Sequence, residues 1–443
     1  MNLNYDEFLE KTMINQPVIN IGMIGHVANG KSTLVKNISG EVTQRHSDEK
    51  IKNITIKLGY ANAKIYQCPK CPKPECYQST ASNIFDYKCT ICSEQCRLLT
   101  HISFVDCPGH SLLMATMLSG ACVMNYAILV ESATNDKIPE LQTMEHFEIA
   151  QEANIQTSFV CLNKLDLMIK NKNKVPDIIE RIENFTQSYG NSILPVIPIS
   201  GTHNINIDIV LEHIVNMPIP KKNLTKDYKM LIIRSFNINK EKTSICDIKG
   251  GVIGGSLLIG KIDLFDEFAI YPGYAKKNPE GSVKSWTCTP LKTKALSINS
   301  GKNNLDYAIP GGLIGIQLDI DPSFTGDDKL TGNVIYNKNK QNVKVYEEIT
   351  LKYKKLTRKL TEYIIEYSKR FDVNDVIQIN VNSNNILSKI KNITKETIEL
   401  VLYNPVCLEI GETVTISNYH ENTHIDIFGH GTFESGVECD LIL

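Results

Sequence analysis

Apolar runs alternate with amphipathic stretches through roughly the first half of the chain. Four of these runs predict buried strands: Val18–Ile24, Ile102–Val105, Ser158–Leu162 and Leu194–Ile199. The segment Lys31–Ile38 predicts a helix that ends at Gly40, and the apolar residues of 207–215 recur on one helical face. Strands that alternate with helices in this way are typical of a parallel sheet that helices cover on both faces.

The pattern changes after Met217–Lys222, a segment rich in proline and lysine that we interpret as a linker. Short β-prone runs follow, separated by glycine pairs such as Gly254-Gly255, as expected of closed barrels. The runs are Met230–Phe236, Ser256–Gly260, Phe268–Tyr271, Leu313–Ile320, Val376–Val381, Thr397–Leu402 and Thr413–Ser417. Lys/Asn-rich stretches such as Asn333–Val343 read as solvated loops. We therefore predict an α/β domain over residues 1–222 and two β-barrel domains over 223–340 and 341–443.

The run Gly25–Thr33 fits a phosphate-binding loop, which needs two glycines five apart, then Lys and then Ser or Thr, between a strand and a helix. Glycine lets backbone N–H groups turn toward the α- and β-phosphates at the positive end of the helix. We expect Lys31 to reach the β- and γ-phosphates and the Ser32 hydroxyl to hold Mg²⁺. The candidate binding residues of this run are Gly25, Ala28, Asn29, Gly30, Lys31, Ser32 and Thr33.

Three further runs complete a nucleotide site, each after a predicted strand. In Asp106–His110, the Asp106 carboxylate can hold Mg²⁺ and the Gly109 N–H can meet a γ-phosphate. In the run Asn163, Lys164, Leu165 and Asp166, the Asp166 carboxylate can accept two hydrogen bonds from guanine. Adenine presents an acceptor there, which would leave the carboxylate unpaired and weaken binding by roughly 1–3 kcal/mol or more. The run Ser200, Gly201 and Thr202 can close over the base with backbone groups. The order of the four runs indicates a GTP-binding domain.

Composition limits the remaining possibilities. The 443 residues are too many for a single hydrophobic core. The 47 Lys plus Arg against 49 Asp plus Glu give a net charge of −2. Because the chain as a whole is not basic, any RNA-binding surface must be local. The amino-terminal residues are polar and acidic, which argues against a signal peptide, and no apolar run approaches the ~20 residues of a membrane span. We therefore expect a soluble, cytoplasmic protein.

Thirteen cysteines in such a chain do not indicate a disulfide framework. Two Cys-x₂-Cys pairs, Cys68 with Cys71 and Cys89 with Cys92, lie within an insertion at about residues 67–97 and have the spacing of a structural zinc ribbon. A set of reduced structural thiols is the alternative, and Cys76 and Cys96 could replace a ligand or have no role. We expect the other cysteines to be buried small apolar residues: Cys107, Cys122, Cys161, Cys246, Cys288, Cys407 and Cys439.

The order of domains resembles the translational GTPases, and several runs resemble the gamma subunit of eukaryotic and archaeal translation initiation factor 2. Asn53–Tyr66 is similar to the first switch and following strand of that family, and the cysteine insertion follows directly, where the family carries its zinc knuckle. Ser103–His110 is similar to its second switch. Further similar runs are Lys249–Ser256, Pro310–Gly315 and, more loosely, Phe428–Thr432. Ala28 resembles the eukaryotic branch.

The resemblance implies an α/β P-loop GTPase domain followed by two β-barrels, acting as a GTP-dependent carrier of initiator methionyl-tRNA to the small ribosomal subunit. It implies GTP or GDP, Mg²⁺ and Zn²⁺ as bound groups, and alpha and beta partner subunits. Thr55 would close over Mg²⁺, Gly109 would sense the γ-phosphate, and His110 would orient the attacking water or act only as a switch residue. No arginine lies in these motifs, so we expect slow hydrolysis that depends on activating and nucleotide-exchange proteins.

Two positions and the segment Glu131–Pro139 depart from the family pattern, and rival functions stay open. Asn29 stands where the family usually has His, and Ser111 where it usually has Asp, which puts the hydrolysis rate in doubt. One rival is an elongation-type carrier or a metabolic GTPase such as the regulatory subunit of a sulfate-activating enzyme; the other is a scaffold that does not hydrolyse GTP. The cysteine insertion and Asn53–Tyr66 argue against the first.

Two features could contact tRNA. Tyr60, expected to be exposed after the first switch, could stack on the terminal adenine, or could only pack the strand edge. A basic cluster could meet phosphates, although such a run is often a solvated face; its members are Lys352, Lys354, Lys355, Arg358 and Lys359.

Overall fold

The computed structural model describes residues 5–43, 55, 58–109, 117, 120–135, 137–190, 193–225, 227–355, 371–418 and 427–442. The chain divides into two compact units. The first comprises residues 1–224 and 297–315, and the second comprises residues 225–296 and 316–443. The predicted limits of three domains, 1–222, 223–340 and 341–443, stay a prediction, because a division into two units does not separate the barrels.

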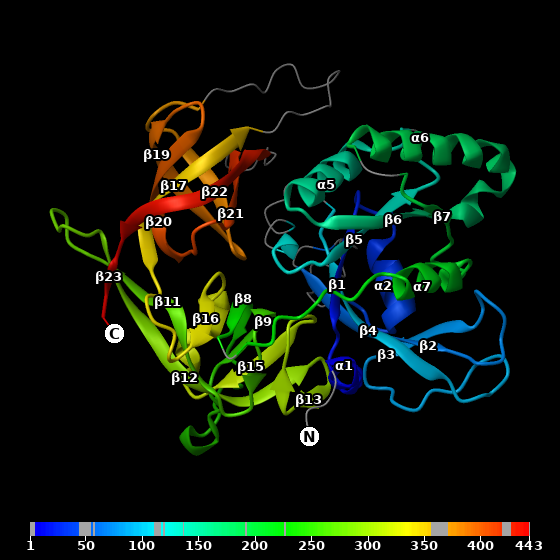
Figure 1. Ribbon diagram of the computed structural model, residues 1–443, viewed down its shortest axis with the longest axis horizontal. Helices are drawn as coiled ribbons and strands as arrows, with labels where there is room; N and C mark the ends of the chain where they lie inside the picture. Colours follow the sequence, from blue (N-terminus) through cyan, green and yellow to red (C-terminus); the bar gives the residue numbers. More distant parts are fainter. Residues whose placement is uncertain are drawn as a thin grey trace. The chain divides into compact units, whose positions relative to one another are not determined.

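A sheet of seven strands, counted over the described residues, forms the centre of the first unit (Figure 1). Its order is β3-β2-β4-β1-β5-β6-β7. The bounds are β1 Ile19–Ile24, β2 Gly59–Gln67, β3 Tyr77–Ala81, β4 Arg97–Asp106, β5 Tyr126–Ser132, β6 Gln156–Asn163 and β7 Val196–Pro198. Strands β4, β1, β5, β6 and β7 are parallel, whereas β2 is antiparallel to both β3 and β4. The expected parallel sheet is therefore confirmed for its centre and wrong for β2.

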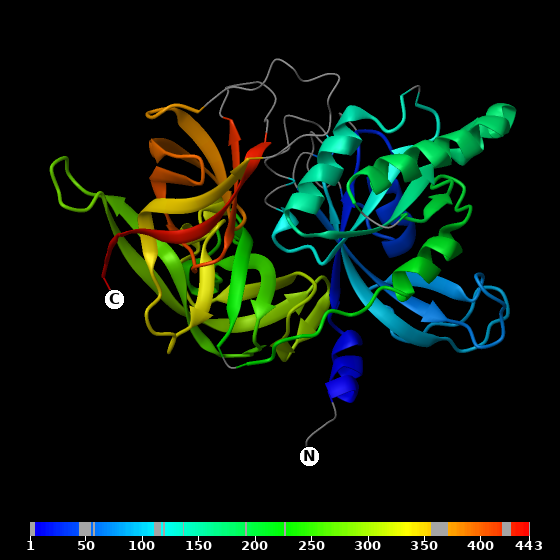
Figure 2. The same cartoon turned by 45° about the horizontal axis from the view of Figure 1, so that its top comes forward.

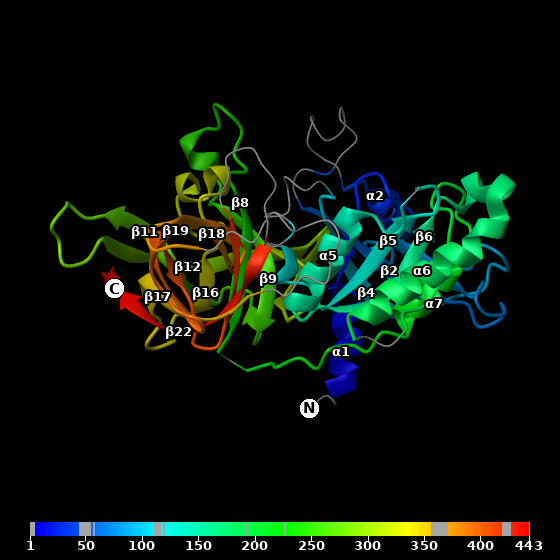
Figure 3. The same ribbon diagram turned by 90° about the horizontal axis from the view of Figure 1, so that it is seen from above.

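Helices cover both faces of this sheet (Figures 1 and 3). The helices α5 (Leu141–Glu152) and α6 (Val175–Ser188) lie on one face, and α2 (Lys31–Ser39) and α7 (Ile207–Val215) lie on the other. The helix α2 ends at Gly40, whose φ of 70° suits glycine and whose N–H donates to the Lys36 carbonyl. On this face, Leu34, Val35 and Ile38 of α2 join apolar residues of α7 and the sheet in one core. The 3₁₀ segment η2 (Leu165–Lys174) follows β6.

A short amino-terminal helix, α1 (Tyr5–Met13), leads into β1 and is dark blue in Figure 2. The Phe8 ring stacks on Tyr307, with 5.5 Å between the ring centroids. Just after the helix, the buried Gln16 side chain donates to the carbonyls of Ile309 and Gly311, at 2.6 and 2.8 Å. These contacts fix the amino-terminal segment to residues 297–315 of the same unit.

The second unit contributes strands to two closed barrels, each of six strands in the described residues. In the first, the path β11-β16-β8-β9-β15-β12 is closed by pairing of β11 with β12. Its strands are β8 Lys229–Phe236, β9 Val252–Ile259, β11 Glu267–Lys277, β12 Trp286–Ser300, β15 Ile314–Leu318 and β16 Val334–Asn337. In the second, the strands are β17 Val345–Lys355, β18 Val376–Val381, β19 Asn384–Ile393, β20 Thr397–Cys407, β21 Thr413–Asn418 and β22 Ile427–Glu438. The short elements are β10 Ile262–Asp263, β13 Asn303–Leu305, β14 Tyr307–Ala308, β23 Asp440–Leu441, η3 Ile245–Asp247, η4 Pro322–Phe324 and η5 Gly326–Asp328.

Several expectations about the barrels and the cysteines need correction. The segment Asn333–Val343 is not only a solvated loop, because β16 buries its apolar residues Val334 to Tyr336 in the sheet. Gly254 and Gly255 do not form a turn but lie inside β9, where a Cβ on Gly255 would lie 1.9 Å from the Leu231 carbonyl oxygen of the neighbouring strand. Cys246 is exposed, although the other cysteines outside the insertion are buried or half-buried as expected.

Candidate functional site

The loop between β1 and α2 has the backbone that its glycines predict. Gly25 has a φ of 131°, and a Cβ there would lie 2.2 Å from the Val130 carbonyl oxygen. Gly30 has a φ of 98°, and a Cβ there would lie 2.1 Å from Nδ2 of Asn163. Ala28 takes a left-handed φ of 62°, which costs an L-residue roughly 1–2 kcal/mol. The loop therefore stores strain where its backbone turns toward the start of α2.

A cavity of about 330 Å³ opens at the amino-terminal end of α2. It is lined by Val27, Ala28, Gly30, Lys31, Ser32, Thr33, Lys36, Val42, Thr43, Thr55 and Gly109. Because unpaired N–H groups and the helix dipole favour an anion at a helix amino terminus, this cavity suits phosphate groups.

The Lys31 side chain is buried at the floor of this cavity. Its Nζ donates to the carbonyls of Gly25 and His26, at 2.7 and 2.8 Å. Burial lowers the pKa of Lys31 to about 8, against the opposing effect of carboxylates such as Asp106. Among the described residues no carboxylate lies within ion-pair distance of Lys31. A buried ammonium held only by carbonyl groups fits an anionic ligand, which would supply the missing negative charge.

Of the residues expected to hold Mg²⁺, Ser32 and Thr55 line this cavity, and the buried Asp106 lies beside the lining residue Thr43. The Ser32 and Thr55 hydroxyl oxygens lie 3.2 Å apart. Asp106, at the end of β4, accepts a hydrogen bond from the Thr43 hydroxyl at 2.6 Å. A Cβ on Gly109 would lie 2.6 Å from Lys31 Nζ, so the second switch begins directly over the lysine. Oxygen donors of these kinds are the ligands that Mg²⁺ takes in nucleotide sites.

The predicted base-reading residues gather beside the phosphate loop but do not line the cavity. Asn163 donates from Nδ2 to the Asn29 carbonyl at 2.8 Å, and its Oδ1 accepts from the Gly201 N–H at 2.9 Å. Asp166 accepts from the Ser200 hydroxyl at 2.6 Å. Asn163 therefore ties the phosphate loop to the loop that follows β7.

Two further members of this set take simpler positions. Lys164 has a left-handed φ of 65° at the turn after β6, and Thr202 is exposed beyond Gly201. Asn29, by contrast, is buried, and its Nδ2 donates to the Val130 carbonyl at 3.0 Å, away from the cavity. Its backbone N–H donates to the His26 carbonyl at 3.4 Å and its carbonyl accepts from Asn163, so Asn29 supports the loop and is not among the residues that line the cavity.

Several residues that support the loop were missed from the sequence. The Gly25 N–H donates to Nδ1 of His146 at 3.0 Å, and the His26 N–H donates to the Thr143 hydroxyl at 3.2 Å. Burial lowers the pKa of His146 to about 3, so the ring stays neutral and keeps its acceptor. Asn37 of α2 donates to the Gly201 carbonyl. In the sequence, Thr143 and His146 could have been noticed only because they are three positions apart, which places them on one face of a helix.

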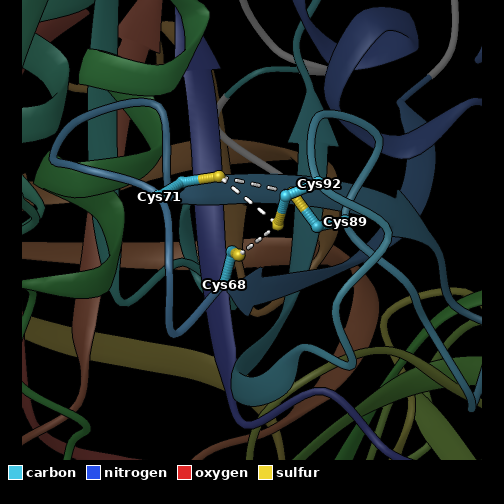
Figure 4. A group of neighbouring side chains, drawn as sticks. All are labelled: Cys68, Cys71, Cys89 and Cys92. Atoms are coloured by element: carbon cyan, nitrogen blue, oxygen red, sulfur yellow. Dashed lines mark hydrogen bonds between the residues drawn. The ribbon is translucent and has the colours of Figure 1, made fainter.

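Four thiols of the cysteine insertion converge (Figure 4). Cys68, Cys71, Cys89 and Cys92 have all of their sulfur atoms within 4.8 Å of one another. The sulfur–sulfur distances are 3.3 Å between Cys68 and Cys92, 3.6 Å between Cys71 and Cys89, and 3.8 Å between Cys71 and Cys92. Thiolates about 2.3 Å from a tetrahedral Zn²⁺ lie roughly 3.8 Å apart, so the four residues fit this ion.

Hydrogen bonds around Cys89 support a thiolate. Its sulfur accepts from Nε2 of Gln78 at 3.2 Å and from the Ile91 N–H at 3.4 Å. Although burial raises the pKa of Cys89, backbone N–H groups of Cys92 and Ile91 bring it down to about 6. Cys76 and Cys96 are buried and do not belong to the four-thiol group in the described residues.

Some predicted residues are placed differently or lie outside the described residues. Tyr60 is not exposed: it lies half-buried in β2, paired with Val105, and its hydroxyl is buried. This position favours packing of the strand edge over base stacking. His110 and Ser111 lie outside the described residues, as do Arg358 and Lys359, while Lys352 and Lys354 are exposed on β17.

Comparisons with known proteins define the class first. A family model described as the elongation factor Tu GTP binding domain matches residues 16–220. The fold is similar to a bacterial selenocysteine-specific elongation factor, with a TM-score of 0.68, 17% identity, and coverage of 94% of this chain and 58% of that one. It is also similar to the elongation factor SelB of Methanococcus maripaludis in complex with the GTP analogue GppNHp, with a TM-score of 0.64, 20% identity, and coverage of 95% and 80%. The chain is a GTPase with the fold of translational GTPases, and its GTPase domain binds GTP or GDP with Mg²⁺.

More similar sequences narrow the class to one family. The chain is 40% identical to eukaryotic translation initiation factor 2 subunit 3 of Drosophila melanogaster, over 97% of this chain and 91% of that one. It is also 40% identical to eukaryotic translation initiation factor 2 subunit gamma of Schizosaccharomyces pombe, over 91% and 90%. A model of the initiation factor eIF2 gamma carboxy-terminal domain matches residues 347–432. The chain therefore belongs to the gamma-subunit family of translation initiation factor 2, and it is a GTP-binding translation initiation factor. Over the part of the chain that the structure describes, no helix has the length and apolar character needed to cross a membrane.

Proposed function

We propose that the GTP form of this chain carries initiator methionyl-tRNA to the small ribosomal subunit. Two relatives are named as subunits of eukaryotic translation initiation factor 2, and the similarity to them spans nearly the whole chain. We therefore also propose that the chain works in a heterotrimer with alpha and beta subunits, in the cytoplasm. The rival reading as a metabolic GTPase has no support in these relatives.

The observation that carries the switch mechanism is the contact between the phosphate loop and the first switch. The Thr55 side chain is buried against Ser32 at the edge of the phosphate cavity, with 3.2 Å between the two oxygens. Because the two hydroxyl oxygens are adjacent, one Mg²⁺ ion bound there could have both as ligands. The ion would then hold the first switch in place when a γ-phosphate is present. We propose that Ser32, Thr55 and Asp106 hold this ion, and that loss of the γ-phosphate frees the segment around Thr55.

Hydrolysis by the isolated chain should be slow. The described lining of the cavity offers Lys31 and Lys36 but no arginine to stabilise the charge of the transition state. We propose that His110, after Gly109, orients the attacking water, and that separate activating and nucleotide-exchange proteins set the rates of hydrolysis and GDP release.

The four-thiol group suggests a structural role for the insertion. We propose that Cys68, Cys71, Cys89 and Cys92 hold one Zn²⁺, which would supply folding free energy to the loops around β3. The remaining predicted nucleotide contacts belong to the same proposal: Gly25, Ala28, Asn29, Gly30, Lys31, Thr33, Asn163, Lys164, Asp166, Ser200, Gly201 and Thr202.

The experiment that tests the proposed function is recovery of RNA with the GTP-loaded protein. The full chain, alone and with its alpha and beta partners, is incubated with total aminoacylated tRNA and GTP or GDP, and the retained RNA is sequenced. We expect enrichment of initiator tRNA with GTP only. Retention of elongator tRNAs to the same extent would instead support an elongation-type carrier, and no retained tRNA would support a scaffold.

A further inference from the structure

A buried carboxylate stands directly behind the phosphate loop. Glu131 lies in β5, where all residues from Tyr126 to Ser132 are buried, and its side chain is fully enclosed. The three preceding residues, Ile128 to Val130, are apolar, as expected of a central strand. Burying an ionised carboxylate without hydrogen-bond partners lowers the stability of the folded state by roughly several kcal/mol. Its presence in the strand therefore calls for a local reason.

The hydrogen bonds of Glu131 lead to the phosphate loop. Its Oε1 accepts from the Ser132 N–H at 3.3 Å and from Nδ2 of Asn135 at 3.2 Å. The same Asn135 amide group donates to Oδ1 of Asn29, at 3.4 Å. Asn29 in turn donates from Nδ2 to the Val130 carbonyl, at 3.0 Å. Glu131 thus orients Asn135, and Asn135 and the backbone of β5 together orient the Asn29 side chain.

Asn29 is the point at which this chain of contacts can act on the loop. It stands between Ala28 and Gly30, whose φ values of 62° and 98° are both left-handed. Glycine adopts this conformation freely, but Ala28, directly before Asn29, keeps it only when the surroundings hold it. Asn29 is held on its other side as well, since its carbonyl accepts from Nδ2 of Asn163 at 2.8 Å. Its side chain and backbone together fix the strained turn that shapes the phosphate cavity.

We propose that Glu131 is a positioning residue for the phosphate-binding loop, acting through Asn135 on Asn29. It touches neither the cavity nor the nucleotide; it keeps the amide of Asn135, and through it Asn29, in the orientation that the loop needs. This inference uses only the binding of GTP or GDP, so it stands whether or not the chain carries initiator tRNA.

The test compares GDP release from matched variants of the full chain. Dissociation of a fluorescent GDP analogue is followed in a chase with excess GDP, together with the thermal midpoint of each variant. Glu131→Leu removes the acceptor and should speed GDP release roughly 5- to 20-fold, as expected for the loss of a buried hydrogen-bond link worth about one order of magnitude in affinity. Glu131→Gln keeps an acceptor oxygen for Asn135, so it should restore release to within about 2-fold of the wild type.

Glu148 provides a matched control, because it is a buried glutamate on α5 whose Oε1 accepts from the Tyr189 hydroxyl at 2.6 Å. Glu148→Leu should lower the thermal midpoint and leave GDP release unchanged. Asn135→Ala breaks the link while keeping the carboxylate, and it should speed release as Glu131→Leu does, with no further gain in the double variant. If Glu131→Leu does not fold, the Asn135→Ala variant alone tests whether the link affects GDP release. Any of three results would overturn the proposal. The first is a wild-type rate of GDP release in both Asn135→Ala and Glu131→Leu, and the second is GDP release from Glu131→Gln as fast as from Glu131→Leu. The third is a rate increase in Glu148→Leu equal to that in Glu131→Leu.

Discussion

Replacing Glu131 by Gln should stabilise the protein at alkaline pH and have little effect in acid. Burial raises the pKa of the Glu131 carboxyl from 4.5 to about 7, and repulsion by Glu140 adds to this, while hydrogen bonds from Thr143, Asn135 and Ser132 oppose it. The folded chain therefore holds a proton on Glu131 between pH 4.5 and about 7, where the unfolded chain has released it. Stability falls as the pH rises through this range, because the folded state binds more protons than the unfolded state.

The size of the effect follows from the shift. One pKa unit corresponds to about 1.4 kcal/mol, so the rise from 4.5 to about 7 makes ionised Glu131 cost about 3 kcal/mol once the pH exceeds 7. Glutamine cannot ionise, so Glu131→Gln should gain up to about this amount at pH 8, and the gain should shrink toward zero near pH 4.5.

The assay is urea unfolding of the two proteins at several pH values between 5 and 8, read by a signal from the GTPase domain. Taking the difference between the two proteins at each pH cancels the titration of all other groups. Glu148→Gln, which removes another buried carboxylate of the same unit, is measured alongside to show how much of any difference comes from the loss of a buried carboxylate elsewhere. A variant that is no more stable than the wild type at pH 8, or whose gain is equal at pH 5 and pH 8, would refute this reasoning.

Two further predictions concern the base and the metal. Asp166→Asn places a donor toward the N1 and N2 hydrogens of guanine, so GTP affinity should fall roughly 10- to 100-fold and xanthosine triphosphate should gain relative to GTP. The exposed Asp177→Asn variant should bind as before, and unchanged GTP binding by Asp166→Asn would make the base-reading assignment wrong. Purified protein should hold about one Zn²⁺, lost on Cys89→Ser and retained on Cys96→Ser, and chelation should loosen residues 67–97 while sparing GTP binding. Metal analysis that finds no zinc under reducing conditions would exclude the ribbon.

The parts of the site that could be predicted from the sequence are those whose residues are close together along the chain. The phosphate loop lies within Gly25–Thr33, and its strand, turn and helix follow from local preferences of glycine and of apolar residues. The two Cys-x₂-Cys pairs likewise indicated a four-thiol group, because the two thiols of each pair are only three positions apart in the chain. Tertiary structure had only to bring these short pieces together.

The residues that support the loop could not be predicted, because only the fold places them there. Thr43 reaches Asp106 across 63 positions of sequence, and His146 reaches the Gly25 N–H across 121. Glu131 was noticed in the sequence only as a charge in an apolar run and as the start of the segment, to Pro139, that departs from the family pattern, and neither feature indicates a contact with the phosphate loop. In the first barrel the sequence was misleading, since the lysines and asparagines around Val334–Asn337 outnumber the apolar residues that the strand buries. The composition of such a segment reflects its solvent-facing residues. Whether its few apolar residues form a buried strand depends on pairing with the neighbouring strands of the barrel.

We propose above all that the γ-phosphate controls the binding of initiator tRNA. The most direct test is the affinity of the full chain, with its partner subunits, for methionylated initiator tRNA in the GTP and GDP states. Since Thr55 and Gly109 both border the phosphate cavity, the GTP form should bind more tightly by about 1–3 kcal/mol, or roughly 5- to 150-fold. Affinity in both states should fall with salt, as expected for phosphate contacts. Equal affinity of the two nucleotide states for the charged initiator tRNA would contradict the account.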